Sequence, residues 1–77
     1  MATTGVLRIL GPSGDTRVAW DSADTAQVEE VRRRFDEIIE GGYLVFELED
    51  GSLEGRQVHT FDPRSKELRA FRPLAGG

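Results

Sequence analysis

Residues 24–42, DTAQVEEVRRRFDEIIEGG, predict an amphipathic helix and so limit the folds open to the rest of the chain. Asp24 or Thr25 can cap its start, and Asp24 with Gln27 has the spacing of a capping box. The two glycines that close the stretch stop the helix. Its apolar side chains recur on one helical face: Val28, Val31, Phe35, Ile38 and Ile39. The opposite face carries Glu and Arg, so the apolar stripe needs a sheet to cover it.

The sequence on both sides of this helix alternates in the manner of β-strands. We predict five strands, at residues 5–10, 16–21, 43–48, 56–61 and 67–72. The segment GPSGD makes the first two strands a hairpin. The segment DPRSK, residues 62–66, makes a hairpin turn between the last two, with Pro63 at its second position.

The order of two strands, one helix and three strands is that of the β-grasp fold, although other small α+β folds share it. We therefore expect an α+β, β-grasp domain, in which one helix packs on a mixed sheet of four to five strands. The last strand should return to the sheet centre, parallel to the first. Residues 1–72 form this single domain. We expect residues 73–77 to form a flexible tail, because Pro73 cannot donate to a strand ladder and the glycines have nothing to pack.

The composition and the net charge argue against several classes of function. The chain has 77 residues, no cysteine and a net charge of −4. Without cysteine it has no disulfide, thiolate nucleophile or cysteine metal site. The negative charge argues against a nucleic-acid partner, since phosphate binding needs a basic surface. We read no signal peptide and no membrane-spanning stretch, and we expect a cytoplasmic monomer.

The residue types that carry catalysis are scarce. His59 is the only histidine, and it falls in a predicted strand, where a lone histidine is usually a surface or packing residue. The aspartates of the turns lack the spacing of a calcium loop, and GPSG lacks the Lys and Ser/Thr of a phosphate loop. We therefore predict no enzyme activity, no metal and no bound cofactor.

Two aromatic residues are candidates for docking a partner. Tyr43 and Phe71 fall on strand faces opposite the residues that we expect to point inward. Most aromatic side chains of so small a domain are needed in its core, but an aromatic side chain left exposed on a sheet offers a contact surface.

The sequence RPLAGG, residues 72–77, offers a different kind of site. Either this segment is a frayed end without a function, or its terminal carboxylate is the reactive group of the protein. Glycine has no Cβ and a wide range of backbone angles, so a glycine pair can enter a narrow enzyme channel and approach a nucleotide closely. A terminal carboxylate must be activated before an amine or sulfide can attack it, and an end free of large side chains suits that reaction.

On the element order and the Leu-x-Gly-Gly ending of residues 74–77, the chain resembles the ubiquitin-like proteins over its whole length. The resemblance implies that an ATP-using enzyme adenylates the Gly77 carboxylate, which then passes to a thioester and to a lysine amine. Gly76 would give access, and Leu74 and Arg72 would be recognised in the tail. The implied partners are this activating enzyme, a conjugating enzyme, a deconjugating protease and the target proteins.

The resemblance has departures. Pro73 stiffens the base of the tail, and Lys66 is the only lysine, which argues against extensive lysine-linked chains. We identify a divergent, prokaryotic member. Two alternatives stay open: a sulfur carrier with a C-terminal thiocarboxylate, and a small module that binds proteins through a sheet edge without conjugation.

Overall fold

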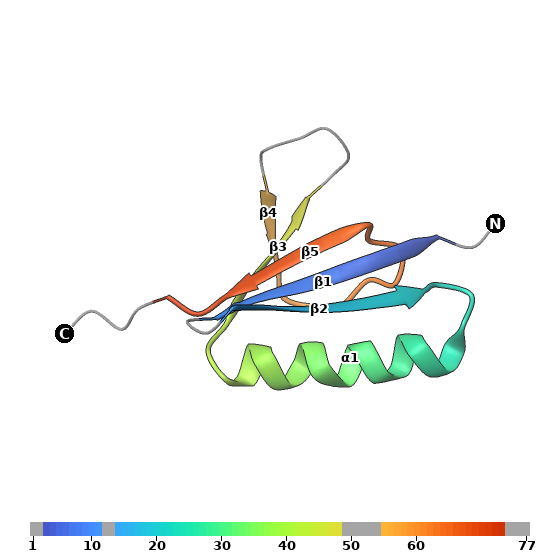
Figure 1. Ribbon diagram of the computed structural model, residues 1–77, viewed down its shortest axis with the longest axis horizontal. Coiled ribbons are helices and arrows are strands. Elements are labelled where there is room, and N and C mark those ends of the chain that lie inside the picture. Colours follow the sequence, from blue (N-terminus) through green and yellow to red (C-terminus); the bar gives the residue numbers. More distant parts are fainter. Residues whose placement is uncertain (1–2, 12–13, 49–54, 74–77) are drawn as a thin grey trace.

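The computed structural model describes residues 3–11, 14–48 and 55–73 as a sheet with one helix beneath it (Figure 1). The elements follow in the order β1 (Thr4–Gly11), β2 (Gly14–Asp21), α1 (Thr25–Glu40), β3 (Leu44–Leu48), β4 (Gly55–Val58) and β5 (Glu67–Phe71). The five strands form one sheet in the order β2-β1-β5-β3-β4. α1 covers one face of this sheet.

The strand directions make this a mixed sheet. β5 runs parallel to β1 and antiparallel to β3, while β1–β2 and β3–β4 are antiparallel pairs. The last strand in the sequence therefore lies at the centre of the sheet beside the first, as predicted. A five-stranded mixed sheet packed by one helix is a β-grasp-like α+β fold, which confirms the predicted class.

The helix begins and ends where its sequence predicts. The Asp24 side chain accepts hydrogen bonds from the N–H groups of Ala26 and Gln27, at 3.1 and 3.2 Å. The capping box is not completed, because Gln27 Oε1 accepts from the Asp21 N–H at 2.9 Å instead. At the other end Gly42 has φ +91°, the left-handed conformation that stops a helix and favours glycine.

The core lies between α1 and the covered face of the sheet. Its buried residues are Leu7, Trp20, Val28, Val31, Phe35, Val45, Leu68 and Ala70. Trp20 joins distant parts of this core. Its Nε1–H donates to the Pro63 carbonyl at 2.9 Å, and its ring meets that of Phe61 edge-on, with centroids 5.1 Å apart. The segment between β4 and β5 is thereby held against the end of the core.

Two strand predictions were wrong, namely the extent of the fourth strand and the hairpin between the last two strands. β4 ends at Val58, so His59 lies in a bend and not in a strand. The chain leaves the sheet there because Phe61 packs against Trp20 and Phe35. β4 and β5 do not form a hairpin, because β3 lies between them. The turn itself is present, with the Ser65 N–H donating to the Asp62 carbonyl at 3.0 Å.

We predict that Gly5→Ala destabilises the fold. A Cβ at Gly5 would overlap the Trp20 ring and lie 2.5 Å from the Ser65 carbonyl oxygen, so either the indole or the backbone must move. The expected loss is about 2 kcal/mol or more in the free energy of unfolding, measured by urea denaturation. Gly11→Ala is the matched control, because among the described residues its Cβ would meet only the Gly14 carbonyl oxygen, at 3.4 Å. Equal stabilities for the two variants would contradict this account.

Candidate functional site

The predicted working end of the chain is only partly described. Leu74, Gly76 and Gly77 lie outside the described residues. Arg72, the other residue expected to be recognised, is exposed and directly follows β5. Because β5 is the central strand, the chain leaves the middle of the sheet at Phe71 and not one of its edges.

Around this exit lies the face of the sheet that α1 does not cover, which we call the open face. Phe71 is paired with Leu10 of β1 on one side and with Leu44 of β3 on the other. Phe46 stacks on Phe71, with ring centroids 5.6 Å apart and an interplanar angle of 5°. Leu10 and Phe71 are 38% and 37% exposed. An apolar row therefore reaches the surface where β5 ends.

Next to this row the open face carries charge. The register places Arg17, Arg8 and Arg69 side by side across β2, β1 and β5. Glu67 contacts two of these three arginines. Its Oε2 accepts from Arg69 Nε at 2.8 Å, and Arg8 Nε lies 3.9 Å from the same oxygen. Like charges directly opposite one another disfavour a sheet, so this cationic row has a cost in stability.

The placement of Tyr43 was predicted wrongly. Tyr43 precedes β3, is half-buried and packs against the core cluster. Val45, two residues further on, is fully buried, so these residues face α1, while Leu44 and Phe46 face outward. Phe71 does lie on the outward face, as predicted. Tyr43 and Phe71 thus do not belong to one surface, and Phe46 takes the position beside Phe71 that the sequence left unidentified.

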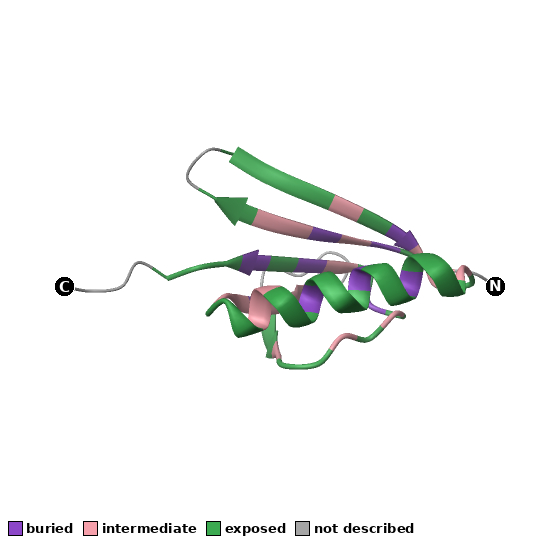
Figure 2. Ribbon diagram, turned by 90° about the horizontal axis from the view of Figure 1, so that it is seen from below, coloured by how far each residue is buried: buried purple, intermediate pink, exposed green. Residues whose placement is uncertain are grey.

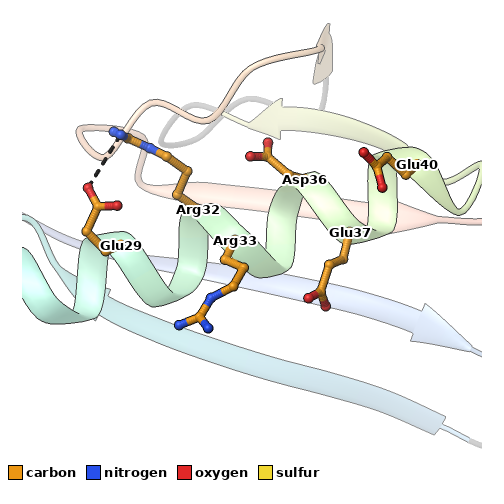
Figure 3. Close-up of a pocket in the computed structure, with 6 residues that line it drawn as sticks. All are labelled: Glu29, Arg32, Arg33, Asp36, Glu37 and Glu40. Carbon is orange, nitrogen blue, oxygen red and sulfur yellow. Dashed lines mark ion pairs between the residues drawn. The ribbon is translucent and has the colours of Figure 1, made fainter.

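The exposed side of α1 carries charged side chains in a shallow hollow (Figure 3). The lining residues are Glu29, Arg32, Arg33, Asp36, Glu37 and Glu40. All six come from α1, so no second element of the described chain encloses a ligand there. Glu29 and Arg32 form an ion pair at 3.5 Å, while Asp36 and Glu40 project to one side of the helix and Glu37 to the other. This hollow is a solvated helix face.

Glu47 is the centre of a group of polar contacts near the start of β5, and these contacts stabilise the fold. Glu47 accepts from Arg56 Nη2 at 2.7 Å and from the Ser65 hydroxyl at 2.8 Å, and Ser65 is only 4% exposed. These bonds tie β3 and β4 to the segment that precedes β5. The exposed His59 takes no part in them. Within residues 3–11, 14–48 and 55–73, no three His, Asp or Glu side chains are placed to hold a metal ion. In the same part of the chain, no helix is long and apolar enough to cross a membrane.

Comparison of the chain with protein-family models, with curated proteins and with solved structures gave no match. The resemblance to ubiquitin-like proteins therefore stays a prediction. What the described residues provide is a β-grasp-like scaffold, an open face with an apolar row and an arginine row, and a chain exit beside that apolar row.

The stacked rings of the open face should couple energetically. We predict that Phe46→Ala and Phe71→Ala, alone and combined, give a coupling of about 0.5–1.5 kcal/mol in urea denaturation, since the offset contact is lost with either ring. Val18→Ala with Phe46→Ala is the control pair. Val18 packs against the core from β2, three places from β3 in the sheet, so additivity is expected. Equal coupling in both pairs would show that the stack contributes nothing specific.

Proposed function

We propose that this chain is a ubiquitin-like modifier, joined to target proteins through the carboxylate of Gly77. The observation that carries the proposal is the course of β5. In a β-grasp-like sheet this central strand ends at Phe71 and directs the exposed Arg72 and Pro73 out of the domain. The sequence that follows them is Leu-Ala-Gly-Gly, which combines an apolar residue with a terminal pair lacking side chains.

The proposed chemistry uses the terminal carboxylate alone. An oxygen of the Gly77 carboxylate attacks the α-phosphate of ATP and displaces pyrophosphate, which gives an acyl-adenylate. An enzyme thiol then displaces AMP to form a thioester, and a lysine amine of the target displaces the thiol to form an isopeptide bond. Two glycines let the activating enzyme close around the backbone. ATP is bound by that enzyme and not by this chain.

The open face gives the activating enzyme a contact beside the reacting end. Phe71 and Leu10 are exposed next to the point at which the chain leaves the sheet, so an enzyme that takes the tail has an apolar surface within reach. Apolar contact of this kind supplies binding energy away from the reacting atoms, which can be used to position the carboxylate.

Activation can be tested without knowing the target. The full chain is incubated with Mg²⁺, ATP and the adenylating enzymes of its source cell, then treated with hydroxylamine, which traps either acyl-adenylate or thioester. We predict an ATP-dependent hydroxamate at Gly77, located by intact mass and by fragmentation. Removal of Gly76 and Gly77 should abolish it.

The matched control is removal of Met1 and Ala2, two residues at the other end of the chain, which should leave hydroxamate formation unchanged. Absence of the hydroxamate from the full chain would contradict the proposal. Replacement of a terminal oxygen by sulfur before hydroxylamine is added would instead identify a sulfur carrier.

A further inference from the structure

β2 is a long, regular strand at one edge of the sheet. It pairs with β1 residue for residue from Gly14 to Asp21, without a bulge, and no other strand of the described residues lies on its far side. Residues 14–17 are all exposed, and this part of β2 is coloured green in Figure 2. A regular, exposed edge offers unpaired backbone groups to another strand. β4, at the opposite edge, spans only four residues.

The hydrogen-bond pattern tells which groups of β2 are free. The Ser22 N–H donates to the Thr3 carbonyl, and bonded pairs recur at every second residue of an antiparallel ladder. The N–H groups of even-numbered β2 residues therefore point to β1. Those of Asp15, Arg17, Ala19 and Asp21 point outward. The Asp21 N–H is already bonded to Gln27 Oε1, so the N–H groups of Asp15, Arg17 and Ala19 are the ones without a partner in the part of the chain that the structure describes.

Two charges on this edge lack a counter-charge among the described residues. Asp15 is paired with Leu10 of β1, and Arg17 is paired with Arg8. Arg17 is thus the outermost member of the row that continues through Arg8 to Arg69. A carboxylate placed against its free side would relieve this row, and a guanidinium would complement Asp15.

A second copy of the chain can place a carboxylate against Arg17 and a guanidinium against Asp15 in only one register. Antiparallel pairing about Arg17 would oppose that arginine to its own copy. Pairing about Val18 or Ala19 would use the Asp21 N–H that Gln27 already occupies. Pairing about Thr16 sets Asp15 against Arg17 of the second copy, twice, and uses only outward N–H groups.

We propose that two copies of this chain associate through β2, antiparallel and centred on Thr16, into a two-fold symmetric dimer with a continuous sheet. Asp15 and Arg17 of each copy exchange backbone hydrogen bonds and form reciprocal ion pairs. The contact is small, so the dissociation constant should lie between micromolar and millimolar. This departs from the monomer expected from sequence and does not depend on Gly77.

A single engineered thiol tests the register, because the chain has no cysteine of its own. Thr16→Cys places two thiols across the two-fold axis at a non-hydrogen-bonded pair, where the Cα atoms lie about 4.5 Å apart, within reach of a disulfide. Under oxidised glutathione we expect covalent dimer to form at least about tenfold faster than with Thr60→Cys. Thr60 is equally exposed but lies beyond β4.

Charge variants that carry no engineered cysteine test the proposed ion pairs. Arg17→Asp sets carboxylates against each other in both pairs, and we expect the dissociation constant from sedimentation equilibrium to rise about tenfold or more. The combined Asp15→Arg, Arg17→Asp chain restores opposite charges and should return to within about threefold of the original value. Circular dichroism establishes that each variant is folded.

Amide exchange gives a second readout on the original chain. At high concentration the Asp15 and Arg17 N–H groups should be protected, while dilution should expose them and leave Asp21 unchanged. A chain that sediments as a monomer up to about millimolar concentration would overturn the proposal. So would equal cross-linking of the two cysteine variants, or edge binding of an unrelated extended peptide without self-association.

Discussion

The indole of Trp20 fixes the position of the segment between β4 and β5, which leads into the central strand of the sheet. It lies against Gly5, its cross-strand partner, and binds the Pro63 carbonyl. Because Gly5 has no side chain, both the ring and the Ser65 carbonyl can approach β1 closely. The residues before β5 are thereby held at the start of β1, where the Val6 N–H donates to the Lys66 carbonyl at 3.0 Å. β5 then enters beside β1 in parallel and separates it from β3, so the central strand is set by one aromatic contact at the end of the core.

One helix of 16 residues covers only one face of a five-stranded sheet, and this limits what the other face can be. Apolar side chains on the open face cannot be buried under a second layer, so they pack against one another, as Phe46 and Phe71 do. Long charged side chains lie beside them. The open face is consequently part apolar and part cationic, although the chain as a whole carries a net charge of −4. Total charge described the molecule poorly, because Arg8, Arg17 and Arg69 lie side by side on this face, whereas α1 carries five acidic and three basic side chains.

The sequence predicted what depends on local patterning. The helical period of α1, the cap at Asp24 and the stop at Gly42 are encoded within a few residues of where they act. The inward face of β3 was not predictable in this way. Both faces of that strand are partly apolar, and only the neighbours settle the choice, because Val45 pairs with Ala70 and Val58 on the covered side. The stack of Phe46 on Phe71 and the arginine row could not be predicted for the same reason, since both arise from the register between strands far apart in sequence. The terminal glycines were found from sequence alone, and they lie outside the described residues.

The two proposals use different parts of one sheet. The tail follows β5, whereas self-association uses the free edge of β2, and β1 lies between these strands. A dimer through β2 therefore leaves Phe71 and Arg72 outside the pairing, and an enzyme acting after Phe71 leaves the N–H groups of Asp15 and Arg17 free. If both hold, pairing would present two reactive ends on one continuous sheet, and the second end would be activated at the high effective concentration set by the first. Since neither site contributes a group to the other, loss of the glycines should leave the edge intact, and loss of the edge should leave each monomer able to react.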